Sequence, residues 1–145
     1  MILVGITITG RCYCGAIELN STQAPKAVAY CHCDDCRRVT GAPVAAFAAF
    51  DETAVSLIPN DGRSVSVHPG VARSFCENCG SPLMSRYDYL PGTVYISLGL
   101  IDQADLLAPQ LHAHESNRFS WLTIDDECKR CPASARTELN SVGSS

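Results

Sequence analysis

Two short stretches decide the fold: residues 12–15 read Cys-Tyr-Cys-Gly, and residues 76–80 read Cys-Glu-Asn-Cys-Gly. In an extended segment, residues i and i+2 point to one face, so both cysteines of the first stretch can reach one ion. In the second stretch the chain folds back around the ion, and glycine tolerates the positive φ that a tight turn needs. Four thiolates form the closed tetrahedral shell of a structural zinc site, whereas two unrelated redox pairs are the alternative interpretation. The predicted ligands are Cys12, Cys14, Cys76 and Cys79.

A second cluster lies at residues 31–36, which read Cys-His-Cys-Asp-Asp-Cys. By the same alternation Cys31 and Cys33 face one way, and Cys36 can return to them over the following turn. His32 faces the other way, so we expect it at the surface or behind the ligands. Catalytic zinc sites use three protein ligands and keep the fourth position for water or substrate. Three cysteines without a fourth ligand nearby therefore predict an open site, and the alternative is a closed structural site completed by a distant Cys or His.

The number and spacing of the cysteines indicate metal binding rather than disulfides. The chain has nine cysteines, an odd number, and two cysteines separated by a single residue, such as Cys12 and Cys14, rarely satisfy disulfide geometry with each other. A further pair, Cys128 and Cys131, encloses Lys129 and Arg130, whose charges favour thiolates. This pair can complete the second zinc site, form a disulfide, act as an auxiliary redox pair, or have no role.

Length and composition predict a single globular domain, because the chain has 145 residues, of which 46% are hydrophobic and 18% charged. The net charge of −4 and the lack of a run of Lys and Arg argue against nucleic-acid binding. The most apolar stretch, residues 42–50, is much shorter than the ~20 residues that a membrane-spanning helix needs. Residues 1–10 lack the positively charged start of an export signal. We therefore expect a cytoplasmic protein that binds neither nucleic acid nor a membrane, whereas the oligomeric state is not fixed by the sequence.

Short strands separated by turn residues dominate the rest of the chain. Residues 64–68, for example, alternate polar and apolar side chains, which is typical of a half-buried strand. The other expected strands span residues 6–11, 16–20, 43–50, 55–58, 71–75, 82–87 and 93–98.

Helix signals are few. A helix of one or two turns is predicted over residues 34–40, ended by Gly41, and residues 101–107 can form another short piece. Large apolar residues almost disappear towards the end of the chain. We therefore predict one zinc-binding domain over residues 1–132 and a flexible tail over residues 133–145.

Read with their neighbours, the cysteine clusters resemble the glutathione-dependent formaldehyde-activating enzyme family, which also includes centromere protein V. The resemblance covers roughly residues 5 to 124, and seven cysteines in register make it specific. The pair Cys128 and Cys131 lies outside the pattern of the family. The residues that carry the resemblance are 10–15, 30–38, 40–41, 73–83 and 94–102, together with His112 and Trp121.

The resemblance implies a mainly β fold, with twisted antiparallel sheets stapled by zinc and one or two short helical turns, similar to the B-type methionine sulfoxide reductase fold. The chemistry it implies is making or breaking a carbon–sulfur bond, as in the formation of S-hydroxymethylglutathione from formaldehyde and glutathione. The expected protein is thus a carbon–sulfur lyase that binds a small thiol such as glutathione and carries about two zinc ions per chain. The resemblance assigns Cys12, Cys14, Cys76 and Cys79 to structural zinc, and Cys31, Cys33 and Cys36 to the active-site zinc.

Other functions and the substrate contacts stay open at this point. The protein can instead be a thiol carrier or a protein-interaction module in which both zinc ions only hold structure. Methionine sulfoxide reduction needs a nucleophilic cysteine in a late strand, and residues 94–121 contain none. Arg37 can bind a carboxylate of the substrate or brace its loop, and His112 can act at the substrate, support the ligands or merely pack. The sequence identifies neither the thiol nor the aldehyde.

Overall fold

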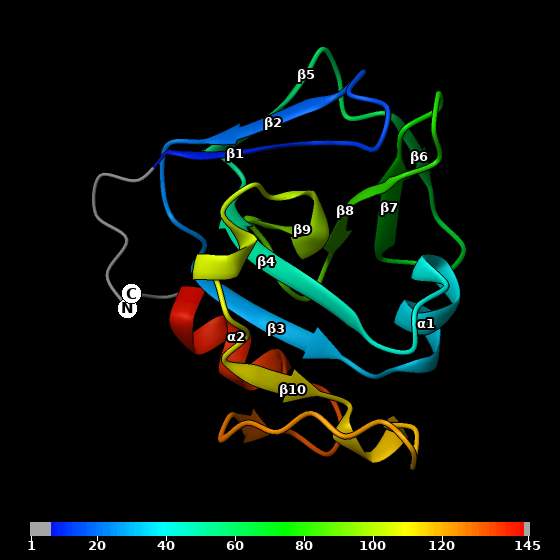
Figure 1. Cartoon of the computed structure of the whole chain (residues 1–145), viewed down its shortest axis with the longest axis vertical. Helices are drawn as coiled ribbons and strands as arrows, with labels where there is room; N and C mark the ends of the chain where they lie inside the picture. The colour runs from blue at the N-terminus through cyan, green and yellow to red at the C-terminus, as the bar shows by residue number, and fades with distance from the viewer. Residues whose placement is uncertain (1–6, 144–145) are drawn as a thin grey trace.

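The computed structural model describes residues 7–143 and is built mainly from two β-sheets (Figure 1). The smaller sheet is antiparallel and has the order β1 (Ile8–Arg11), β2 (Glu18–Ser21), β5 (Val55–Ile58). The larger sheet has the order β11 (Lys129–Arg130), β10 (Leu111–Ala113), β3 (Ala27–Cys31), β4 (Ala45–Asp51), β9 (Thr93–Ser97), β8 (Pro82–Tyr87), β7 (Val71–Phe75), β6 (Arg63–Val65).

The larger sheet is mixed, because β10 runs parallel to both of its neighbours, β3 and β11. The mainly β architecture is confirmed, whereas the likeness to B-type methionine sulfoxide reductases stays a prediction. Ile6, the first residue of the expected first strand, lies outside the described residues. Within residues 7–143 no helix combines the length and the apolar character needed to cross a membrane. The helices are α1 (Asp34–Thr40), α2 (Arg136–Gly143) and the 3-10 turns η1 (Leu98–Leu100), η2 (Ala104–Leu106) and η3 (Glu115–Asn117).

Strand β4 lies in the middle of the larger sheet and is buried on both faces, as its run of apolar residues predicts. On one face Phe50 packs with Ile96 and with Ile8 of the smaller sheet, which forms the core between the sheets. On the other face Phe47 packs with Tyr95, in the layer that also contains the second cysteine cluster. Burial of each of these side chains stabilises the fold by about 1.5–3 kcal/mol. The central strand therefore connects the main core with the candidate site.

Helix α1 begins and ends where the sequence predicts. The Sγ of Cys33 accepts a hydrogen bond from the backbone N–H of Cys36 at 3.2 Å and so caps the first turn. Gly41 follows the last turn with φ of 73°, the left-handed conformation that glycine adopts without a steric cost. The helix thus holds two cysteines of one cluster, one as its cap and one in its first turn.

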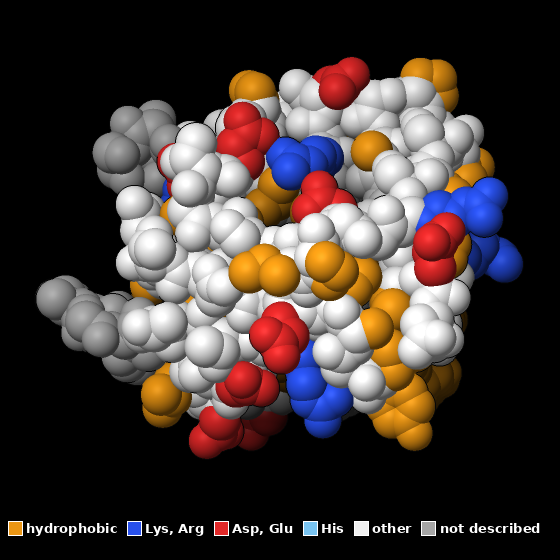
Figure 2. All heavy atoms as spheres, turned by 90° about the horizontal axis from the view of Figure 1, so that it is seen from above, with side chains coloured by type: hydrophobic (Ala, Val, Ile, Leu, Met, Phe, Trp, Pro, Cys, Tyr) orange, Lys and Arg blue, Asp and Glu red, His pale blue; other side chains and the backbone are white. Residues whose placement is uncertain are grey.

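Charged side chains of both signs are mixed with apolar ones on the face that includes the smaller sheet (Figure 2). No broad area of Lys and Arg is visible among the described side chains of that face. This mixture agrees with the modest net charge of −4.

The segment expected as a flexible tail, residues 133–145, contains helix α2, and residues 144–145 lie outside the described residues. The hydroxyl of Ser134 accepts a hydrogen bond from the N–H of Arg136 at 3.0 Å and fixes the start of the helix. Ala135 is buried, and Leu139, one turn further on, packs on the same apolar layer. The four-residue spacing of Ala135 and Leu139 indicates this helix, although most of the surrounding residues are small or polar.

Cys128 and Cys131 flank β11 and are built into the sheet. Cys131 is only 7% exposed, and its N–H donates to the carbonyl of His112 at 2.8 Å. The thiol of Cys128 donates to the carbonyl of Pro109 at 3.1 Å. Both thiols are free, and neither belongs to a metal-binding group within the described residues. The structure thus shows this pair packed into the sheet, a role that was not among those left open by the sequence.

Gly10→Ala tests the close approach of β1 to the 3-10 turn η1. A Cβ at this position would collide with the backbone oxygen of Leu100, so the two segments would have to separate. We expect the free energy of unfolding to fall by about 1–3 kcal/mol, measured by urea denaturation. Gly99→Ala is the matched control, since a Cβ there meets nothing within 4 Å. Equal losses in the two variants would show that β1 does not depend on this contact.

Candidate metal centres

The first cysteine cluster has the geometry of a tetrahedral zinc site. The four sulfur atoms of Cys12, Cys14, Cys76 and Cys79 lie within 4.8 Å of one another, and none forms a disulfide. The sulfur of Cys14 is 3.6 Å from that of Cys12 and 3.9 Å from that of Cys76. Tetrahedral zinc with Zn–S bonds of about 2.3 Å places its sulfurs about 3.8 Å apart. The residues present therefore fit a zinc ion.

Donors around this cluster favour thiolates. The N–H of Ile17 donates to the sulfur of Cys12 at 3.3 Å. The hydroxyl of Ser81 lies 3.2 Å from the sulfur of Cys79 and accepts a hydrogen bond from the N–H of Tyr13 at 2.9 Å. The contact with Ser81 is the largest reason why the pKa of Cys79 falls to about 5. Ser81 thus links the two segments that contain the cysteines. It also stabilises the thiolate form of Cys79.

The second cluster begins where β3 ends. Cys31 is the last residue of that strand, and its thiol donates to the sulfur of Cys33 at 3.3 Å. This hydrogen bond lowers the pKa of Cys33 and raises that of Cys31. Cys36, buried in α1, also interacts with both sulfurs through its side chain. The structure therefore brings Cys31 and Cys33 together, whereas Cys36 lies next to them but outside the group of ligand atoms that are all within 4.8 Å of one another.

The structure adds a residue that the sequence did not indicate, His114. Its ring and the sulfurs of Cys31 and Cys33 offer ligand atoms that all lie within 4.8 Å of one another. Pairing of β10 with β3 places Ala113 opposite Cys31, so the next residue reaches the cluster. The sequence His112-Ala113-His114 has the same one-residue spacing as the cysteine pairs, but only the strand pairing reveals which partner it meets. Thiolate and imidazole are ligands that zinc prefers, so this cluster also fits the ion.

A small cavity of about 70 Å³ opens beside the second cluster. Its wall is mostly apolar and aromatic, and Leu139 of α2 covers part of it. A larger hollow of about 310 Å³ between α1 and β7 contains no cysteine. The lining of the small cavity includes Cys31, Cys36, Tyr87, Tyr95 and His114.

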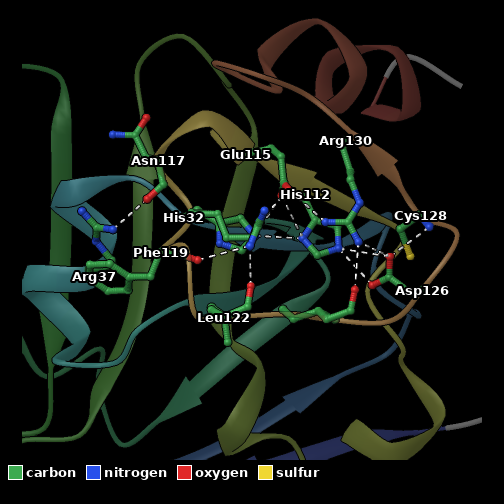
Figure 3. Close-up of polar contacts among 12 residues, drawn as sticks. His32, Arg37, His112, Glu115, Asn117, Phe119, Leu122, Asp126, Cys128 and Arg130 are labelled. Atoms are coloured by element: carbon green, nitrogen blue, oxygen red, sulfur yellow. Dashed lines mark hydrogen bonds and ion pairs between the residues drawn. The ribbon is translucent and has the colours of Figure 1, made fainter.

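Two buried histidines join the loop that follows β3 to the C-terminal segment (Figure 3). His32 and His112 are both 0% exposed, and their Nε2 and Nδ1 atoms are 2.8 Å apart. His112 Nε2 lies 2.9 Å from a carboxylate oxygen of Asp126. Because a carboxylate only accepts, His112 carries its proton on Nε2, and its Nδ1 accepts from His32. His32 is therefore not at the surface but fixed in the interior by His112, so of the two expected positions only the one behind the ligands remains.

Charged groups surround the histidine pair. Burial of Glu115 is outweighed by hydrogen bonds from Arg118 and Arg130, so the pKa of Glu115 falls below its ordinary value. Burial is also the main reason why the pKa of His32 is lowered, which keeps its ring neutral.

The group formed by His32, His112 and Glu115 also has ligand atoms within 4.8 Å of one another. Two nitrogens bound to one zinc at 2.0–2.1 Å lie about 3.3 Å apart. The observed 2.8 Å between the rings is instead a hydrogen-bond distance. We interpret the network as one that positions the loop of the second cluster, which places His112 behind the site and out of reach of a substrate.

Arg37 points towards Asn117 and braces the neighbouring loop (Figure 3). Its guanidinium donates to the carbonyl of Asn117 at 2.8 Å and lies 4.1 Å from the ring centre of Phe119. Phe119 in turn stacks on Trp121. These contacts support the bracing role of Arg37 over binding of a substrate carboxylate.

Comparison with known proteins identifies a family whose matched region includes both clusters. The family model described as glutathione-dependent formaldehyde-activating enzyme matches residues 7–117, which contain both cysteine clusters and His114. A protein of Schizosaccharomyces pombe named as an uncharacterized lyase is 35% identical over 78 residues, or 54% of this chain and 56% of the yeast protein. The chain thus spans about half the length of this relative.

A crystal structure of a Rhodobacter sphaeroides protein has a TM-score of 0.56 and 19% identity, over 70% of this chain and 96% of that chain. This likeness shows a shared fold. The match to the family ends before Asp126, β11 and α2.

Asp126→Asn tests the histidine network through acid stability. The hydrogen bond from His112 is the main reason why the pKa of Asp126 is lowered in the folded chain. A carboxyl of this kind stabilises the fold above its unfolded pKa of about 3.9, and the contribution is lost as the pH falls through the lower folded value. The variant should therefore melt at a lower temperature at neutral pH, and its stability should fall less steeply below about pH 4. Asp125→Asn, at the neighbouring exposed position, is the control, and identical pH profiles of the two variants would contradict the network.

Proposed function

Because this chain belongs to the glutathione-dependent formaldehyde-activating enzyme family, we propose that it is a zinc-dependent carbon–sulfur lyase acting on the adduct of a small thiol with an aldehyde. The observation that carries the proposal is the position of the second cluster, where Cys31 and Cys36 form part of the wall of an aromatic cavity. The first cluster bridges segments that are far apart in the chain and is proposed as the structural site. Glutathione and formaldehyde are the substrates that the family name indicates.

The residues that would hold the active-site zinc are Cys31, Cys33 and Cys36. When bound there, zinc would activate the thiol as a thiolate or polarise the oxygen of the adduct. The cavity is mostly apolar, so it excludes water from the reacting carbon–sulfur bond and strengthens polar contacts inside it. About two zinc ions per chain follow from the two clusters.

Tyr95 is the side chain best placed to bind the oxygen of the adduct. It lines the cavity, is only 6% exposed, and its hydroxyl makes no hydrogen bond within residues 7–143. The oxygen of the neighbouring Tyr87 hydroxyl already accepts a hydrogen bond from the hydroxyl of Ser85 at 3.1 Å. Burial raises the pKa of Tyr95, so the hydroxyl keeps its proton and acts as a donor. A hydroxymethyl or carbonyl oxygen would satisfy this donor.

None of the nine cysteines forms a disulfide, which agrees with a reducing compartment such as the cytoplasm, the location that we propose. Nucleic acid is not among the proposed partners, because the net charge of −4 gives no attraction to phosphates. The alternative function is a non-catalytic thiol carrier or interaction module in which both zinc ions are structural.

Two serine substitutions separate these functions. Cys76→Ser should lower soluble yield and melting temperature severely, because a structural zinc ion supplies on the order of 10 kcal/mol of folding free energy. In Cys33→Ser the serine still caps α1, and the metal closes only a short loop, so the stability loss should be smaller. This variant should retain about one zinc ion per chain and lose the binding of glutathione measured by calorimetry. Unchanged thiol binding in folded Cys33→Ser would favour the interaction module.

Tyr95→Phe tests the proposed oxygen contact. Loss of this donor should lower the rate of adduct formation from formaldehyde and glutathione, followed by NMR, by about tenfold to a hundredfold. The zinc content and the melting temperature should stay close to those of the wild type, since the ring and its packing remain. Tyr87→Phe is the control because it removes another hydroxyl of the same cavity wall, one whose oxygen already accepts a hydrogen bond from Ser85. Equal rates in the Tyr95 variant and the wild type would remove Tyr95 from the mechanism.

A further inference from the structure

The second cluster contains an imidazole that the three-cysteine site does not use. His114 is half-buried, and its ring lies within ligand distance of the same ion that Cys31 and Cys33 would hold. The ring also forms part of the wall of the aromatic cavity. We propose that His114 is the fourth zinc ligand of the resting protein and that the thiol substrate displaces it. This inference rests on the proposed zinc site and adds how access to that site is controlled.

The backbone at His114 is held in a conformation that favours this role. His114 has φ of 54° and ψ of 43°, the only positive φ of a non-glycine residue within residues 7–143. Such left-handed geometry costs about 1–2 kcal/mol for a residue with a Cβ. Residues of this kind persist where the surroundings determine the conformation, and they concentrate at functional sites.

Contacts on both sides fix the chain at this residue. Before it, the carbonyl of Ala113 accepts from the N–H of His32 at 3.0 Å, within the parallel pairing of β10 with β3. The N–H of His114 donates to the carbonyl of Ala133 at 2.7 Å. After it, the N–H of Glu115 donates to the carbonyl of Cys131 at 2.9 Å. The histidine network and the C-terminal segment therefore hold the imidazole at the cysteines.

The chemistry of the ligands explains why His114 is exchangeable. Three thiolates and one neutral imidazole form a closed zinc shell, which is stable in a resting protein. An incoming thiolate is a softer and charged ligand that competes well for the same position. Because the ring forms the cavity wall together with Cys31 and Cys36, the position that it leaves opens into the cavity beside Tyr95. Zinc binding by His114 and occupation of that position by a thiol therefore exclude each other.

Zinc X-ray absorption of the full-length protein tests the proposal, because imidazole gives an outer-shell scattering pattern that thiolates lack. The first cluster consists only of cysteines, so an imidazole signal reports on the second site. We expect the signal in the wild type, its loss in His114→Gln, and its loss from the wild type on addition of glutathione. His68→Gln is the matched control, since His68 is exposed and contacts Asp35 rather than a cysteine.

Calorimetry with glutathione supplies the second readout. If His114 occupies the zinc position, glutathione binds only to the fraction of protein in which that position is open, which lowers its apparent affinity. His114→Gln removes this competition and should bind the thiol roughly tenfold more tightly. His114→Asn, a residue that tolerates left-handed geometry, replaces the glutamine variant if that variant does not fold.

The outcomes distinguish this inference from the function on which it rests. A wild type with about two zinc ions and no imidazole signal, or a signal that survives in the His114 variants, overturns the role of His114 alone. Loss of the signal with unchanged thiol affinity overturns the displacement. A wild type with only about one zinc ion overturns both the inference and the proposed function.

Discussion

The parallel pairing of β10 with β3 is the interaction on which the candidate site depends. It sets His112 opposite Tyr30 and Ala113 opposite Cys31. From this one register follow the contact of His112 with His32 and the approach of His114 to the cysteines. The same strand then pairs with β11, which leads the chain into α2 above the cavity. The cysteine-containing loop after β3 thereby forms one wall of a pocket, and distant parts of the chain form the other walls.

Holding this register leaves buried polar atoms without partners. The Nδ1 of His32 and the Oε2 of Glu115 have no hydrogen-bond partner within the described residues. A buried group of this kind costs about 1–3 kcal/mol. The remaining contacts offset part of that cost, since Arg118 and Arg130 bind the other oxygen of Glu115. The strained backbone of His114 directly precedes Glu115. Backbone strain and unpaired buried polar atoms therefore occur together next to the second cluster.

Local features of the fold and site could be predicted from the sequence, because their causes lie within a few residues. The spacing of the cysteines predicted both clusters, and Gly41 marked the end of α1. Features that depend on long-range pairing could not be predicted in this way. Nothing near His32 in the sequence shows that it meets His112, and His114 joins the cysteines only through the strand register. Helix α2 was missed because its packing rests on one small residue, Ala135, and on Leu139.

The central claim is that the second cluster is a zinc site at which a small thiol binds. Crystals of the protein, grown with zinc and soaked with glutathione, test it most directly by anomalous scattering at the zinc edge. The account predicts one anomalous peak at each cysteine cluster and the glutathione sulfur at the second peak, on the side of the aromatic cavity. A single peak at the cluster of Cys12, or a second zinc ion with no thiol beside it at saturating glutathione, would contradict the claim.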